Sequence, residues 1–171
     1  AGIIKPGRPM VSAPQSDAVM EVLQQAGEAI IRSSDAVSVV KTGSPQKLKI
    51  ETHSRSLPPT HLPLLGECQR ENCAVAVASL EILAEILDFE PEFKKGLESV
   101  SWPARFEIFG SDPPVVFDGA HNPSAARALV KTLKEAYPKH RIGFILGFLD
   151  DKDSVEFVRI LKPLVSKVWA V

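Results

Sequence analysis

The chain has 171 residues, of which 44% are hydrophobic and 24% charged, and its formal net charge is −1. This balance is typical of a folded globular protein and excludes an intrinsically disordered one. The near-neutral charge gives no indication of a nucleic acid or an anionic membrane as partner, and no apolar run approaches the roughly 20 residues that span a bilayer. The length allows one ordinary domain or two small ones.

Residues 1 to about 98 mix strand patterns with two helical patterns. After Ser16, which is a suitable N-cap, apolar residues recur at helical spacing as far as Arg32. The strongest helical pattern covers residues 67–87, where apolar side chains occupy nearly every face, so we expect that helix to be buried all round. We expect strands at residues 9–12, 37–40 and 47–51.

The two cysteines, Cys68 and Cys73, lie in the same predicted helix. Their spacing of five matches neither zinc ligands nor a thioredoxin-type pair. We therefore expect free thiols, which fits a reducing compartment such as the cytoplasm.

From about residue 106 the pattern changes to apolar strands that alternate with helices. Such alternation indicates a parallel sheet covered by helices, and residues 99–105 would link it to the first half. Pro123 suits the first turn of the first of these helices. We expect helices at residues 123–137 and 154–161, a strand at 106–109, and the strands of the parallel sheet at 115–117, 142–146 and 168–171.

The most informative stretch runs from Val115 to Pro123 and reads VVFDGAHNP. Its apolar strand leads into a tight loop with Asp118 and His121, and Asn122 is a suitable N-cap for the next helix. Ligands of open α/β sheets bind beyond the carboxyl ends of the strands, where a helix N-terminus also offers N–H groups to anions. An aspartate there can accept hydrogen bonds from a ribose, and a histidine can stack on a base, contact phosphate or move a proton. The alternative is that Asp118 caps a turn and His121 is an ordinary surface residue.

The run Asp-Gly-Ala-His-Asn-Pro at residues 118–123 resembles the C-terminal-domain signature of the folylpolyglutamate synthase/dihydrofolate synthase family, a branch of the Mur ligase superfamily. Further segments resemble the same family in the same order, so that the resemblance covers almost the whole chain. These segments are Ala-Gly-Ile-Ile-Lys-Pro-Gly-Arg-Pro at 1–9, Leu-Gly-Glu-Cys-Gln-Arg-Glu-Asn at 65–72, Trp-Pro-Ala-Arg-Phe-Glu at 102–107 and Gly-Phe-Leu-Asp-Asp-Lys-Asp at 147–153.

The resemblance implies an α/β fold with two domains. Residues 1–98 would be the end of a Mur-ligase-type central domain, which binds ATP in the family, and residues 99–105 would be the linker. Residues 106–171 would begin a Rossmann-like parallel-sheet C-terminal domain that closes over the nucleotide. On this interpretation the chain is truncated, with both ends inside a longer protein.

The resemblance also implies which residues form the site. Arg105 and Asp118 would complete the nucleotide pocket, and Asn72 would approach the nucleotide. His121 would lie near the nucleotide and the incoming glutamate, which makes it the catalytic candidate. Arginine suits phosphate because its planar guanidinium stays charged and can bind in a bidentate way. Structural roles are the alternative: Arg105 could pair with a carboxylate, Asn72 could cap its helix, and His121 could serve only the fold.

Parts of the chain depart from the family pattern or suit an ordinary structural role. Cys68 stands where the family usually has histidine, which weakens any role for that side chain. Ala104 replaces the usual glycine before Arg105, and although its methyl restricts the backbone we expect the change to be neutral. Lys152 and Asp153 are more typical of a solvated helix start than of a ligand site.

The implied activity is that of a ligase that uses ATP and Mg²⁺ to join L-glutamate to a folate or a dihydropteroate carboxylate through an acyl phosphate. The chain contains no Gly-x-x-x-x-Gly-Lys-Ser/Thr sequence, so the phosphate-binding loop and the magnesium ligands are expected upstream, and no metal ligand is expected in this chain. In the family a lysine that is carbamylated would directly precede Ala1. We therefore expect this chain to be inactive by itself.

Two rival functions stay open. One is a peptidoglycan-type Mur ligase, against which the opening Ala-Gly-Ile-Ile-Lys-Pro-Gly and the glycine after Asp118 argue. The other is a non-catalytic module that binds a nucleotide without turnover. The sequence does not indicate which acceptor is used or whether the protein forms oligomers.

Overall fold

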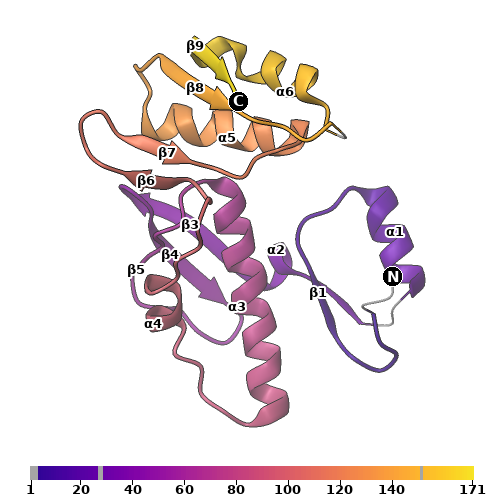
Figure 1. The fold of residues 1–171 in the computed structure, drawn as a ribbon. Helices are drawn as coiled ribbons and strands as arrows, with labels where there is room; N and C mark the ends of the chain where they lie inside the picture. Colours follow the sequence, from indigo (N-terminus) through magenta and orange to yellow (C-terminus); the bar gives the residue numbers. More distant parts are fainter. Residues whose placement is uncertain (1–3, 27–28, 151) are drawn as a thin grey trace. The chain divides into compact units, whose positions relative to one another are not determined.

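The computed structural model describes residues 4–26, 29–150 and 152–171 (Figure 1). The chain divides into two compact units, called unit 1 and unit 2 below. Unit 1 contains residues 1–63 and 68–100, and unit 2 contains residues 64–67 and 101–171. The predicted α/β class is confirmed, because helices and parallel strand pairs occur together. The assignment of residues 1–98, 99–105 and 106–171 to particular ligase domains stays a prediction. Residues 1–3 of the expected opening motif lie outside the described part of the chain.

Unit 1 begins with a parallel strand pair joined by a helix. The elements are β1 (Met10–Ser12), α1 (Asp17–Ala26), β2 (Ile30–Arg32) and the short α2 (Ser33–Ala36). The helix starts directly after Ser16, as predicted, but the expectation that it continues to Arg32 is wrong. Ile30 and Ile31 are β-branched residues that favour a strand, and they pair with Met10 and Val11.

A three-stranded antiparallel sheet follows, in the order β3 (Val37–Gly43), β4 (Lys47–Thr52) and β5 (Thr60–His61). Alternation along β4 buries Leu48 and Ile50 completely, while Lys47 and Lys49 point to solvent. The strand predicted at 47–51 is therefore present, and the one predicted at 37–40 is longer than expected.

Helix α3 (Glu67–Leu87) runs alongside this sheet, and the short α4 (Phe93–Glu98) contacts β5 (Figure 1). The turn after β4 is tied to α3 because Thr52 Oγ1 donates a hydrogen bond of 2.7 Å to Glu81. The expectation that α3 is buried all round is wrong. Its buried residues, such as Val77, lie on one face, whereas Ile86 and Leu87 are 52% and 61% exposed.

Within its described residues, 64–67, 101–150 and 152–171, unit 2 contains two strand pairs and two helices of more than one turn. An antiparallel hairpin of β6 (Glu107–Phe109) and β7 (Val115–Phe117) precedes α5 (Pro123–Ala136) and β8 (Ile142–Leu146). Helix α6 (Ser154–Leu161), a 3₁₀ turn (Lys162–Leu164) and β9 (Val165–Ala170) follow, and β9 pairs with β8 in parallel.

Two details of unit 2 differ from the sequence prediction. The sequence pattern predicts β7 within the parallel sheet, but this strand pairs antiparallel with β6, from which only a short loop separates it. Closing such a short loop costs little conformational entropy, and this favours the hairpin. The last strand begins at Val165 instead of Val168, because Val165 and Lys167 also pair with β8, with a register shift between them.

The core of unit 2 lies on one face of the β8–β9 pair. Phe144 of β8 packs with Ala126 of α5 and with Phe157 and Leu161 of α6, and Phe106 belongs to the same cluster. This core fixes the start of α5, and with it the loop that joins β7 to α5.

The opposite face of the β8–β9 pair is open to solvent in unit 2. Ile145 is 72% exposed and Trp169 is 46% exposed. The Trp169 ring covers Gly143, where an added Cβ would lie 2.9 Å from Cζ3 of the indole. The Lys167 ammonium lies 4.8 Å from the centroid of the same ring, within the range of a cation–π contact.

Candidate functional site

The candidate site is built on the loop between β7 and α5, in unit 2. Asn122 is the N-cap of α5, and its side-chain oxygen accepts a hydrogen bond of 2.9 Å from Ala125 N. Pro123 occupies the first turn, where its missing N–H costs nothing. Both features agree with the sequence prediction, and they end the loop at a fixed point.

Asp118 braces this loop against the segment before β6. Its Oδ2 accepts a hydrogen bond of 2.9 Å from Phe106 N, and its Oδ1 accepts one of 2.8 Å from Ala120 N. The second bond is the turn cap that the sequence left open as an alternative. Each carboxylate oxygen has two lone-pair sites, so one site on each oxygen is left for a ligand donor.

Arg105 lies on an unusual stretch of backbone beside the same loop. Its neighbours Ala104 and Phe106 both have positive φ angles, of 54° and 51°. Gly119 lies next to its guanidinium, because a Cβ added at Gly119 would be 3.2 Å from Arg105 Nη1. The two segments are also joined through their backbones, since Gly119 N donates a hydrogen bond of 2.9 Å to Ala104 O.

The exposed guanidinium of Arg105 forms no hydrogen bond or ion pair with any part of the chain that the structure describes. The alternative of a structural pair with a carboxylate therefore finds no support in this structure. An exposed arginine without an internal anion is a suitable group for binding phosphate.

His121 is exposed on the loop, and its Nδ1 lies 2.8 Å from Gly119 O. A carbonyl only accepts, so Nδ1 carries the proton in this contact. In the neutral tautomer Nε2 then carries no proton and is the ring nitrogen that can accept one. The ring is held locally by the backbone and still presents one nitrogen to solvent.

The structure thus brings Arg105, Asp118 and His121 together on one loop region of unit 2. Asn72 belongs to unit 1, in the second turn of α3, where its Nδ2 donates a hydrogen bond of 3.1 Å to Gln69. A residue inside a helix does not cap it, so the capping alternative for Asn72 is wrong. The ligand roles of all four residues stay predictions.

Asp153 has the simple role that the sequence favoured. It is the N-cap of α6, and its side chain accepts a hydrogen bond of 3.1 Å from Glu156 N. Asp151 of the same motif lies outside the described residues.

Glu107 and Gly119 are two residues of this region that the sequence interpretation missed. The Glu107 carboxylate accepts a hydrogen bond of 2.9 Å from Ala104 N. Both residues lie inside the quoted motifs, directly beside Arg105 or Asp118. The motif match was the available signal, but residue type alone does not reveal a backbone contact.

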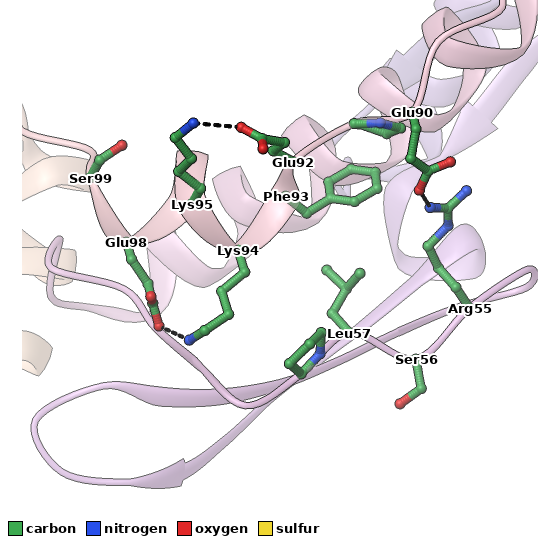
Figure 2. A pocket seen from close by; sticks show the side chains of 12 residues that line it. Arg55, Ser56, Leu57, Glu90, Glu92, Phe93, Lys94, Lys95, Glu98 and Ser99 are labelled. Carbon is green, nitrogen blue, oxygen red and sulfur yellow. Dashed lines mark hydrogen bonds and ion pairs between the residues drawn. The ribbon is translucent and has the colours of Figure 1, made fainter.

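An open groove in unit 1, about 820 Å³ in volume, is lined by residues 55–58, 90–95, 98 and 99 (Figure 2). Its charges are paired within the groove: Arg55 with Glu90, Lys94 with Glu98, and Lys95 with Glu92. The hydrogen bond from Lys94 holds the pKa of Glu98 below its usual range, and the His61 backbone N–H acts in the same direction. None of the predicted site residues lines this groove, so it is not the candidate site.

The described residues hold neither a metal centre nor a membrane span. Within residues 4–26, 29–150 and 152–171, no group of three or more His, Cys, Asp or Glu side chains is arranged to hold a metal ion. None of the helices in the same residues has the length and apolar character needed to cross a membrane.

Comparison with known proteins decides the family. Residues 104–171, which carry Arg105 and the β7–α5 loop, match the family model described as Mur ligase, glutamate ligase domain. A probable bifunctional folylpolyglutamate synthase/dihydropteroate synthase from Halobacterium salinarum is 34% identical over 168 residues, which cover 95% of this chain and 20% of that protein. The chain belongs to the folylpolyglutamate synthase/dihydrofolate synthase family.

Further members of this family agree in sequence and in structure. Folylpolyglutamate synthase from Lacticaseibacillus casei is 31% identical over 181 residues, which cover all of this chain and 42% of that protein. A solved FPGS–AMPPCP–folate complex is similar in fold, with a TM-score of 0.88 and 29% identity, and the match covers 99% of this chain and 43% of that one. The chain therefore spans from a fifth to less than half of the length of these family members.

Proposed function

We propose that the protein to which this chain belongs is an ATP-dependent ligase that joins L-glutamate to the carboxylate of a folate, of dihydropteroate, or of both. The observation that carries the proposal is the grouping of Arg105, Asp118 and His121 on one loop region within the matched domain. The relatives' names support the folate branch over a peptidoglycan-type ligase. A solved relative bound to AMPPCP and folate supports an ATP site and a folate site.

The proposed reaction has two steps. A carboxylate oxygen of the acceptor attacks the γ-phosphate of ATP, which gives an acyl phosphate and ADP. The glutamate amine then attacks the acyl carbon, which forms the amide, releases phosphate and loses a proton. Preorganised positive groups stabilise the negative charge that develops on the transferred phosphoryl group.

We assign Arg105 to the phosphate groups of ATP, because its guanidinium is exposed and has no anion within the described residues. We assign Asp118 to the ribose hydroxyls, which can donate to the second lone pair of each carboxylate oxygen. Asn72, in unit 1, would also approach the nucleotide. The described residues offer no donor set for Mg²⁺, so its ligands would be supplied by the rest of the protein.

His121 is the candidate for moving the proton that the glutamate amine must lose. Its Nδ1 is held by Gly119 O, which leaves Nε2 as the acceptor. Histidine is the side chain most often used for general acid–base proton transfer in enzymes, as this step requires.

The test is an assay of the full-length protein with ATP, glutamate, and either a reduced folate or dihydropteroate, with the product identified by mass spectrometry. Arg105→Ala and Asp118→Ala should each raise the apparent KM for ATP. Arg127→Ala is the matched control, because Arg127 is also exposed in unit 2 but lies on α5 and not on the loop. Glutamylation of neither acceptor, or unchanged ATP kinetics in both loop variants, would contradict the proposal.

A further inference from the structure

The backbone on both sides of Arg105 has a conformation that must be stabilised by its surroundings. Ala104 and Phe106 both adopt left-handed φ angles, of 54° and 51°, which residues with a side chain adopt rarely. Such a conformation persists only where the surrounding structure holds it in place. Groups outside this short segment must therefore stabilise it.

Two carboxylates hold the backbone on either side of Arg105. On one side, Glu107 Oε2 accepts a hydrogen bond of 2.9 Å from Ala104 N, and on the other side Asp118 Oδ2 accepts one of 2.9 Å from Phe106 N. Gly119 N adds a hydrogen bond of 2.9 Å to Ala104 O. The buried Phe106 side chain anchors the segment in the core of unit 2.

These contacts fix where the Arg105 guanidinium can go. The side chain leaves a backbone clamped at both neighbours and lies against Gly119, where a Cβ would approach Nη1 to 3.2 Å. A long arginine side chain otherwise loses considerable rotamer entropy when it binds a ligand, and preorganisation reduces that loss. Glu107 is half-buried and its carboxylate contacts the Ala104 backbone, so its contribution would reach a nucleotide only through Arg105.

We infer that Glu107 is a positioning residue: by accepting the hydrogen bond from Ala104 N, it holds Arg105 in the orientation that binds the phosphates of ATP. This inference rests on the proposed function for the role of Arg105. The conservative replacement Glu107→Gln keeps an oxygen that accepts from Ala104 N, whereas Glu107→Ala removes it. Positioning therefore predicts rescue by glutamine and loss with alanine.

A double-mutant cycle in the full-length ligase separates positioning from a general structural effect. Glu107→Ala should raise the apparent KM for ATP by roughly five- to tenfold, as expected for one lost hydrogen bond, with a smaller effect on kcat. Glu107→Gln should stay within about twofold of wild type, by the same reasoning. In an Arg105→Ala background, Glu107→Ala should cause no further increase, because its effect passes through the missing side chain.

Backbone amide exchange gives a readout that does not depend on activity. In the native protein, Glu107→Ala should speed exchange of the Ala104 amide, while Glu107→Gln should leave it protected. If the wild-type protein shows no dependence on ATP, the proposed function fails. The exchange rates still test whether Glu107 holds the Ala104 backbone through the hydrogen bond. The inference is overturned if Ala104 exchange does not change in Glu107→Ala, if glutamine weakens ATP use as much as alanine, or if Glu107→Ala raises KM equally with and without Arg105.

Discussion

Replacing Ala104 by glycine should stabilise the protein, although it removes a methyl group and loosens the unfolded chain. Ala104 has a φ of 54°, a conformation that glycine adopts without steric cost. For a residue with a Cβ, the left-handed conformation costs about 1–2 kcal/mol. Glycine makes the unfolded state more flexible, which opposes the gain by about 0.5–1 kcal/mol. The net expectation is a stabilisation of about 0.5–1 kcal/mol.

The assay is thermal unfolding followed by circular dichroism. A gain of this size should raise the Tm by about 1–4 °C when measured on this chain of 171 residues. Ala76→Gly is the matched control, because Ala76 is exposed in the middle of α3, where glycine costs about 1 kcal/mol relative to alanine. The same chemical change should therefore act in opposite directions at the two positions.

The result that refutes the reasoning is a fall in Tm for Ala104→Gly comparable to that of Ala76→Gly. That outcome would mean that the Ala104 backbone is not strained, or that the hydrogen bond from Ala104 N to Glu107 forms only when residue 104 has a side chain. From the sequence we expect alanine at this position to be neutral, whereas the φ of 54° leads us to expect a cost in stability for any residue with a Cβ.

Three further predictions concern stability and reactivity. Burial raises the pKa of Cys73 to about 11, so at pH 8 only about one Cys73 thiol in a thousand is ionised. Iodoacetamide should therefore label the half-buried Cys68 far faster than Cys73, as measured by peptide mass spectrometry. Equal labelling rates would contradict this prediction. Phe157 lies in the core of unit 2, and Phe157→Ala should lower the free energy of unfolding by about 3–5 kcal/mol, as measured by urea titration. Phe157→Leu should lower it clearly less. A loss below about 1 kcal/mol for Phe157→Ala would show that the side chain is not closely packed. Asn122→Ala should cost about 1 kcal/mol in the same assay, and Asn122→Asp much less because aspartate also caps helices; equal losses would argue against the capping bond.

Local signals in the sequence predicted the candidate loop well. Asn122 and Pro123 fix the start of α5 through their own chemistry, and the strand before them is short and apolar. Asp153 caps α6 in the same local way. Such features depend on residues close in sequence, so they can be identified from the sequence alone.

Features that depend on distant partners were not predictable. The pattern of α3 shows which side chains are apolar, but not which face is covered, and Leu87 proved exposed. The sequence pattern predicted β7 in the parallel sheet, but its residues suit an antiparallel neighbour equally well. The Glu107–Ala104 hydrogen bond depends on residues with left-handed φ angles, which no sequence motif predicts here.

The stacking of Trp169 on Gly143 equips the domain with a natural optical reporter. The chain has only two tryptophans, and Trp169 lies on the β8–β9 pair while Trp102 lies before Arg105. Separating the two strands would uncover the indole and move it away from the Lys167 ammonium, which alters its fluorescence emission. With Trp102 replaced by phenylalanine, opening of this strand pair could be followed in real time without an attached dye.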